Sequence, residues 1–169
     1  VFRGLDPETL RRGLLGETFT GSATHGKQMC FRFGTKHWLG IHLGMTGKTH
    51  ILALGEKPQK HDHLVLQMSS GVSLAFRDPR MFGRILYSYT NNKPSWWAML
   101  PPEILSTDFT LEYLSRFLDR RSRSPIKAVL LMQQTFPGLG NWMADEILWR
   151  SRIHPKIMAG KLSTYKRKK

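Results

Sequence analysis

The hydrophobic pattern of this chain changes period once, and this change limits the folds open to it. Up to Tyr89, short runs rich in β-branched and aromatic residues alternate with glycines and polar clusters at hairpin spacing, which is typical of antiparallel strands. After Ser106, apolar residues recur every three or four positions, as on one face of a helix. The sequence therefore predicts an α+β fold, with a β-rich domain followed by a helical domain.

Prolines and polar residues interrupt every period between these halves, which indicates a linker. We place the β-rich domain at 1–95, the linker at 96–106 and the helical domain at 107–169. The expected strands lie within 27–34, 37–44, 49–54, 61–68, 72–78 and 83–89.

The helical half carries three start signals. Thr107 or Asp108 is a candidate N-cap of the first helix. Ser124 is a candidate N-cap of the second, with Pro125 at its first helical position. The third helix follows the turn "FPGLG" and begins near Asn141.

The charge balance indicates a polyanionic partner. Lys and Arg number 26 against 12 Asp and Glu, so the net charge is +14 and the pI is about 10.4. Such an excess attracts nucleic acid or an anionic membrane. No apolar run approaches the length of a membrane span, and the charge is spread along the chain instead of following one amphipathic helix. These patterns favour nucleic acid and no membrane.

Neither cysteine nor histidine forms a metal-binding pattern. Cys30 is the single cysteine and is expected as a buried, inert thiol in a strand, so a four-cysteine zinc site is excluded within this chain. In "KHDH", alternation along a strand places His61 and His63 on one face and Asp62 on the other. Two ligands do not make a site, so we predict no metal in this chain.

Two loops offer side chains suited to opening a base stack. The motif "DPRMFG" at 78–83 breaks a strand-like run and presents Arg80 beside Phe82. Proteins that kink DNA or extrude a base use apolar wedges, and an arginine can fill the space left empty. The motif "HLGMTG" at 42–47 presents Met45 between glycines in the same way. The alternative is a hairpin whose apolar residues are half-buried packing residues.

The turn "FPGLG" before the third helix indicates a phosphate contact. Two glycines let the backbone approach another surface, and the free N–H groups of a helix start favour an anion. Asn141 can cap this helix or donate to a phosphate oxygen. The alternative is an ordinary corner between helices, and the charge of +14 favours phosphate.

Five motifs together resemble one family. The motifs "HGKQ", "HLGMTG", "KHDH", "DPRMFG" and "GLGNWMADEILWRSRIHP" occur in the order and spacing of the formamidopyrimidine-DNA glycosylases, the Fpg branch of the Fpg/Nei family. The resemblance runs from "RRGLLGETF" to "HPKIMAGKL". It implies a β-sandwich domain joined to a helix–two-turn–helix (H2TH) domain, with duplex DNA in the cleft between them, in a monomeric, cytoplasmic protein.

The resemblance also implies an activity. The full-length protein would be a bifunctional glycosylase and AP lyase of base-excision repair, acting on duplex DNA with oxidised bases or abasic sites. Met45 and Arg80 would occupy the space of the everted nucleotide, Arg80 would bind the orphaned cytosine, and Phe82 would wedge beside it. The Nei branch lacks "HLGMTG", so oxidised purines such as 8-oxoguanine and formamidopyrimidines fit better than oxidised pyrimidines.

Further positions match residues of the family that contact the DNA backbone. Lys27 and His42 would bind the phosphates that flank the lesion, and Asn141 would bind phosphate from the helical domain. Lys127, in "SPIKAVLL", is similar to a family lysine near the damaged nucleotide.

The chain departs from the family at both ends. The family's reaction uses an N-terminal proline, whose amine forms a Schiff base before β,δ-elimination, and an adjacent glutamate. This chain begins "VFRGLDPETL", and it lacks the family's C-terminal four-cysteine zinc finger. We therefore name no catalytic residue and expect the chain by itself to be inactive, as part of a full-length protein with one structural zinc.

Two alternatives stay open from the sequence. One is a catalytically inactive Fpg-like protein that keeps the wedge and binds DNA. The other is an H2TH-containing RNA- or ribosome-associated module, although structured RNA gives a wedge no B-form stack to open.

Overall fold

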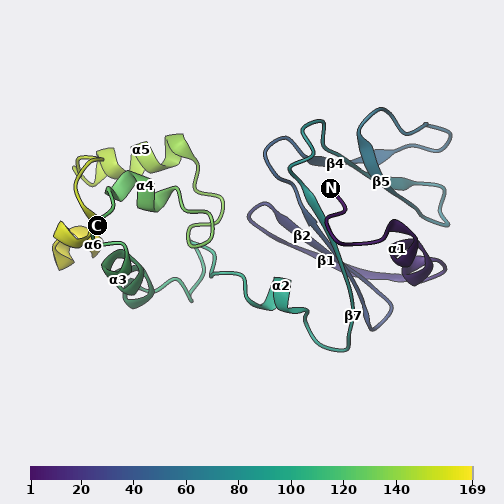
Figure 1. The fold of residues 1–169 in the computed structure, drawn as a ribbon, viewed down its shortest axis with the longest axis horizontal. Coiled ribbons are helices and arrows are strands. Elements are labelled where there is room, and N and C mark those ends of the chain that lie inside the picture. Colours follow the sequence, from purple (N-terminus) through teal and green to yellow (C-terminus); the bar gives the residue numbers. More distant parts are fainter. Residues whose placement is uncertain (169) are drawn as a thin grey trace. The chain divides into compact units, whose positions relative to one another are not determined.

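The structure, a computed structural model, describes residues 1–168 and divides into two compact units, residues 1–98 (unit 1) and 99–169 (unit 2) (Figure 1). The division falls inside the segment 96–106 that the sequence assigns to a linker. The order of a β-rich half before a helical half confirms the α+β prediction, while the exact domain bounds stay a prediction.

Unit 1 contains two antiparallel sheets. The four-stranded sheet has the order β1 (Phe19–His25), β2 (Gln28–Phe33), β3 (His37–His42) and β7 (Arg84–Tyr89). The three-stranded sheet has the order β4 (Lys48–Leu52), β6 (Ser73–Arg77) and β5 (Asp62–Gln67). The chain passes between the sheets twice, from β3 to β4 and from β6 back to β7.

The two sheets share one core, so the β-sandwich prediction is confirmed. Leu39, Ile41 and Ile85 of the four-stranded sheet cluster with Phe76 of the other, and all four are at most 1% exposed. Burial of such side chains contributes about 1.5–3 kcal/mol each. Leu10 joins the cluster from helix α1 (Pro7–Leu14), which Asp6 caps by accepting hydrogen bonds from two backbone N–H groups.

Three elements of unit 1 were not predicted. Strand β1 is rich in Ser, Thr and Gly and mostly exposed, because it lies at the edge of its sheet and has no buried apolar alternation. Helix α1 buries only Leu10, so its apolar stripe is too short to mark a helix. A further short helix, α2 (Ser95–Ala98), ends unit 1.

Unit 2 is helical. Its elements are α3 (Leu111–Arg120), α4 (Ile126–Leu130), α5 (Asn141–Arg150), the 3₁₀ helix η1 (Ala159–Lys161) and α6 (Thr164–Lys168). Their core includes Val129, Phe136 and Ala144, each at most 2% exposed. Over residues 1–168, no helix combines the length and hydropathy that crossing a membrane requires.

Two helix starts differ from the sequence prediction. Thr110, not Thr107 or Asp108, caps α3, because the preceding segment forms turns and the Thr110 hydroxyl accepts from the Tyr113 N–H at 3.1 Å. Pro125 occupies the N-cap position of α4, one residue before the position predicted for it, and no side chain caps this helix.

Candidate nucleic-acid interface

The two loops singled out in the sequence lie against each other in unit 1. Residues 42–47 lead from β3 to β4 and residues 78–83 lead from β6 to β7. Gly44 has a φ of +65°, and a Cβ built on it would lie 2.7 Å from the backbone nitrogen of Gly83. Such a distance excludes any side chain at Gly44, so the loops pack backbone against backbone.

The carboxylate of Asp78 fastens this contact. It is fully buried, and it accepts hydrogen bonds from the Thr46 hydroxyl at 2.9 Å and the Gly83 N–H at 2.6 Å. Burial alone raises the pKa of Asp78, but hydrogen bonds from Gly83, Thr46 and the Arg80 backbone hold it below its ordinary value. An ionised carboxylate thus joins both loops from within the unit.

The side chains predicted as a wedge are exposed. Met45 is 66% exposed and Phe82 is 46% exposed, whereas a core phenylalanine such as Phe76 is 1% exposed. The guanidinium carbon of Arg80, also exposed, lies 4.9 Å from the centre of the Phe82 ring, a cation–π geometry. Neither Met45 nor Phe82 is therefore a core residue of unit 1.

The residues that join the two loops are direct neighbours of the exposed side chains in the sequence. Met45 stands between Gly44 and Thr46, and Phe82 precedes Gly83. The backbone is therefore held where the side chains project. That Met45, Arg80 and Phe82 act on a base stack stays a prediction.

Lys27 and His42 come together at one end of the four-stranded sheet. The Leu43 N–H donates to the Lys27 carbonyl at 2.9 Å, which holds the β1–β2 turn beside the end of β3. His42 Nδ1 accepts from the Gly44 N–H at 3.0 Å, so Nε2 carries the proton of the neutral ring. Burial, and then the charges of Arg84 and Lys27, lower the pKa of His42. A neutral imidazole with one free N–H can donate to a phosphate oxygen.

Asn141 and Lys127 come together in unit 2. Asn141 is the first residue of α5, whose N-cap is Gly140, so of its two possible roles the capping role is wrong. Its exposed side chain is thus not used as a cap. The Lys127 ammonium lies 2.8 Å from a carboxylate oxygen of Asp145, one helical turn after Asn141. The pair holds Lys127 beside the helix face that carries Asn141.

The turn before α5 is fastened by a residue that the sequence did not single out. The side chain of Gln133 donates to the Leu139 carbonyl at 2.7 Å and accepts from the Gly138 N–H at 3.1 Å. Gly138 has a φ of +83°, in the left-handed region. No local signal marks Gln133, because its partners lie five and six residues further along.

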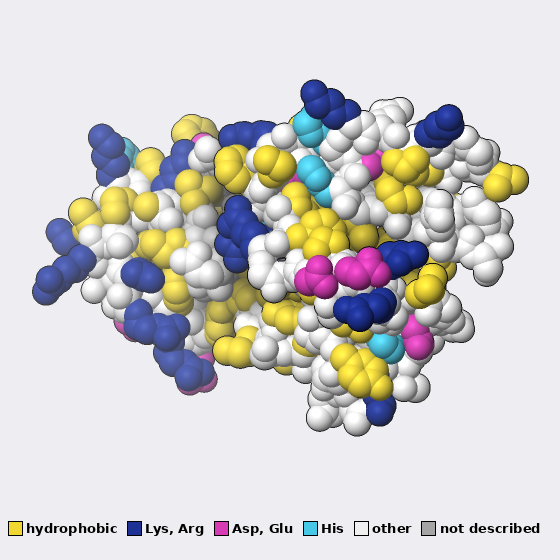
Figure 2. Space-filling view, turned by 45° about the vertical axis from the view of Figure 1, so that its right-hand side comes forward, with side chains coloured by type: hydrophobic (Ala, Val, Ile, Leu, Met, Phe, Trp, Pro, Cys, Tyr) yellow, Lys and Arg dark blue, Asp and Glu magenta, His cyan; other side chains and the backbone are white. Residues whose placement is uncertain are grey.

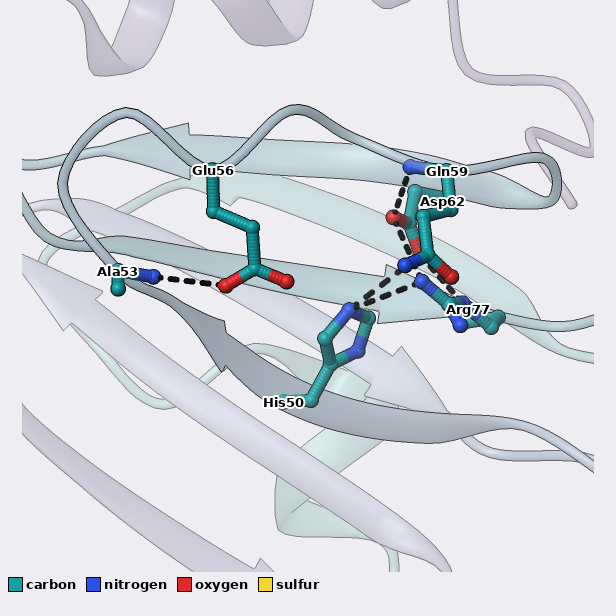
Figure 3. A network of polar contacts seen from close by, with 6 residues as sticks. All are labelled: His50, Ala53, Glu56, Gln59, Asp62 and Arg77. Carbon is teal, nitrogen blue, oxygen red and sulfur yellow. Dashed lines mark hydrogen bonds and ion pairs between the residues drawn. The ribbon is translucent and has the colours of Figure 1, made fainter.

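Asp62 of the "KHDH" motif belongs to a network of polar contacts within unit 1 (Figure 3). Asp62 accepts from the Arg77 guanidinium at 2.8 and 3.1 Å and from the Gln59 N–H at 2.8 Å. These bonds, led by Arg77, lower the pKa of Asp62. The rings of His61 and His63 lie 6.3 Å apart, but His61 precedes the strand, so their sharing of a strand face stays a prediction.

No metal site forms in the part of the chain that the structure describes: no three His, Cys, Asp or Glu side chains gather there as ligands. Cys30 is 3% exposed, and burial raises its pKa to about 11, which disfavours the thiolate that metals bind. The zinc implied by the resemblance therefore finds no ligand set among these residues.

Comparison with known families decides what this arrangement belongs to. Residues 1–85 match the formamidopyrimidine-DNA glycosylase N-terminal domain, and residues 100–169 match the formamidopyrimidine-DNA glycosylase H2TH domain. The chain belongs to the formamidopyrimidine-DNA glycosylase family. The second match confirms unit 2 as the predicted helix–two-turn–helix domain.

Relatives within the formamidopyrimidine-DNA glycosylases span more than this chain. The enzyme of Legionella pneumophila strain Lens is 40% identical over 152 residues, which are 88% of this chain and 54% of that protein. That of Lactobacillus delbrueckii subsp. bulgaricus (ATCC 11842) is 38% identical over 160 residues, 94% of this chain and 58% of that protein. The chain thus covers a little over half the length of these relatives.

Solved glycosylase structures share the fold. MutM in complex with DNA containing carbocyclic 8-oxo-G is 31% identical, with a TM-score of 0.84 over 95% of this chain and 61% of that one. The complex of Lactococcus lactis Fpg with abasic-site DNA is 32% identical, with a TM-score of 0.83 over 95% of this chain and 59% of that one.

Proposed function

We propose that this chain is the damaged-DNA-binding part of a base-excision-repair glycosylase and AP lyase that everts oxidised purines. The observation that carries the proposal is the exposed set Met45, Arg80 and Phe82 on two loops joined by buried Asp78. Family membership and the similarity to glycosylases solved on lesion-containing DNA support the same function.

The wedge depends on a fixed loop backbone and on the shapes of the three side chains. Opening a base step costs a few kcal/mol, so the inserted group must hold its position against restacking. Phe82 inserts as an apolar plate whose backbone is fixed by the Gly83–Asp78 hydrogen bond. Arg80 offers a planar set of donors to the base left unpaired, and Met45 fills the apolar space of the everted nucleotide.

The phosphate contacts hold the duplex without reading the lesion. Lys27 and His42 supply them from unit 1, and Asn141 supplies one from unit 2. Lys127, which is paired with Asp145, is assigned separately to the neighbourhood of the damaged nucleotide. Figure 2 shows Lys and Arg side chains spread over the face drawn, with Asp and Glu covering less of it. If roughly six phosphates are engaged, log affinity falls against log salt with a slope of about −5. A nearly flat salt dependence would contradict this binding mode.

We assign the nucleophile of base excision to no residue of this chain. Among the described side chains, Cys30 is buried and Lys127 is engaged by Asp145. Borohydride trapping of the purified 169-residue chain on an 8-oxoguanine duplex is expected to give no adduct. A trapped adduct would refute this assignment.

The test compares point variants on two duplexes. Phe82→Ala and Arg80→Ala should reduce affinity for an 8-oxoguanine duplex at least tenfold more than affinity for undamaged duplex, because only the extruded state uses them. Lys27→Ala should weaken both duplexes alike, since a phosphate contact carries no lesion information. Leu54→Ala, at a loop side chain that is 83% exposed, is the control.

Two outcomes would contradict the proposal. One is an equal effect of Arg80→Ala on the affinity for damaged and for undamaged DNA, which favours the alternative that these loops are an ordinary hairpin. The other is tighter binding of the unmodified chain to structured RNA than to either duplex, which favours the RNA-associated alternative.

A further inference from the structure

A row of hydrogen-bond donors crosses the four-stranded sheet at one end. Gln28, His42 and Arg84 are direct partners across β2, β3 and β7. Residues directly opposite in antiparallel strands project on the same face, about 5 Å apart from strand to strand. Lys27 precedes Gln28 in the β1–β2 turn, so four donor side chains meet at this margin.

This row lies on the face of the sheet that points away from the core. Ile41 and Ile85, the neighbours of His42 and Arg84, are buried in the core, and successive side chains of a strand alternate between faces. Trp96 of α2 covers the next position on the outer face, since a Cβ on Gly40 would lie 2.7 Å from its ring. Arg84, beyond that cover, is exposed.

The electrostatics of the row suit an anion. Arg84 and Lys27 both lie close enough to His42 to lower its pKa, after the effect of burial. Within residues 1–168, no carboxylate forms an ion pair with Arg84 or Lys27. The margin therefore combines two cations with the donors of His42 and Gln28, and it lacks a neutralising acid.

The row also stands at the base of both wedge loops. His42 is the residue from which loop 42–47 leaves β3, and Arg84 is the residue at which loop 78–83 enters β7. A group bound at this margin therefore contacts residues that lie three positions before Met45 and two positions after Phe82.

We propose that Arg84 is a further phosphate-binding residue, and that Arg84, His42, Gln28 and Lys27 together form one phosphodiester-binding site at the base of the wedge. The planar guanidinium presents two parallel N–H groups to phosphate oxygens, while the ammonium, imidazole and amide supply single donors. A phosphodiester has only acceptor oxygens and a negative charge, so it is the ligand that this set of donors fits. The proposal rests on the proposed DNA-binding function.

The test replaces Arg84 with an uncharged and with a charged residue in the 169-residue chain. Arg84→Gln keeps the length but not the charge, and Arg84→Lys keeps the charge but not the planar fork. Arg12→Ala, at an exposed position of α1, removes one positive charge elsewhere on unit 1 and serves as the matched control. Affinity is measured by fluorescence anisotropy over a salt series, on an undamaged duplex and on one with an abasic site.

Arg84→Gln should weaken both duplexes about tenfold and reduce the salt slope by about 0.9. Arg84→Lys should keep the slope and regain only part of the affinity, and Arg12→Ala should change little. Thermal unfolding of the three variants should match the unmodified chain, because both arginines are exposed.

The outcomes separate this inference from the proposed function. If the unmodified chain binds DNA and Lys27→Ala weakens it, but Arg84→Gln behaves like Arg12→Ala, the role of Arg84 is wrong and the DNA-binding function stands. If the unmodified chain binds neither duplex, the proposed function itself fails. An effect of Arg84→Gln on the abasic duplex alone would also overturn a phosphate role, and would place Arg84 at the lesion.

Discussion

The two units hold their candidate DNA contacts by different means. In unit 1, the loops that carry Met45 and Phe82 are joined from inside by the fully buried carboxylate of Asp78. In unit 2, the turn before α5 is held by the exposed side chain of Gln133, and Lys127 by an ion pair in which Asp145 is 57% exposed.

The roles proposed for the two regions account for this difference. A wedge works against the restacking of bases, so its backbone has to stay in place under load. A phosphate contact needs charge and reach, and it tolerates small adjustments. Exposed ion pairs contribute about 0–1 kcal/mol, whereas removing one partner of a buried charged network costs about 3–5 kcal/mol. The buried carboxylate of Asp78 therefore supports the loops whose proposed role requires a fixed backbone.

The largest expected effect tests whether Phe82 is exposed or belongs to the core of unit 1. Phe76→Ala should lower the free energy of unfolding of unit 1 by about 3–5 kcal/mol, because Phe76 lies inside the shared core of the two sheets. Phe82→Ala, six residues later along the chain, should cost less than about 1 kcal/mol. Urea unfolding of both variants measures the difference, and similar losses would contradict an exposed wedge.

The second largest effect is expected when the buried carboxylate of Asp78 is removed. Asp78→Ala should lower the free energy of unfolding of unit 1 by about 3 kcal/mol, since the buried Gly83 N–H and the Thr46 hydroxyl lose their partner. Hydrogen exchange read by mass spectrometry reports each unit separately. Unit 2 should keep its protection, because its core shares no residue with that of unit 1. An equal loss of protection in both units would show that the effect of Asp78 is not confined to unit 1.

Lowering the pH should reduce the stability of unit 1 more than that of unit 2, by a smaller amount than the substitutions above. The pKa values of Asp62 and Asp78 are lowered in the folded state, so their stabilisation is full above the unfolded value of about 3.9 and is lost as the pH falls through the folded values. In unit 2, Asp119 has a lowered pKa from its bond with Arg167 but is 62% exposed, and contributes little. Between about pH 6 and pH 3, the urea midpoint of unit 1 should fall further. A larger fall in unit 2 would reverse the comparison.

The smallest effect is expected at the unit 2 turn. Gln133→Ala should cost about 1 kcal/mol, because its two hydrogen bonds are replaced in part by water. Duplex binding through Asn141 should weaken only slightly. A loss as large as that of Asp78→Ala would show that both units support their contacts equally firmly.

The sequence revealed what depends on local pattern. Alternating and helical periods record which face of each element is buried, so the order of the two units followed from them. The exposed Arg80 and Phe82 followed from a motif that interrupts a strand with a proline. Strand β1 did not, since an exposed edge strand has no apolar alternation to record.

What the sequence missed depends on long-range pairing. Asp78 looks like an ordinary turn carboxylate, and only the fold shows it buried against Thr46. The role proposed for Arg84 depends on the pairing of β7 with β3, which sets it in register with His42. That pairing joins strands separated by a whole second sheet, and no local signal encodes it.

The backbone contact between Gly44 and Gly83 has a consequence for anyone who would re-engineer lesion preference. The two loops form a single transplantable unit, because each supplies the surface on which the other rests. A graft that imports one loop from another glycosylase, without its counterpart, would bring a mismatched backbone to a contact with no room to adjust. If Met45, Arg80 and Phe82 set lesion preference as proposed, that preference is more readily changed by exchanging these three side chains, or by moving both loops together.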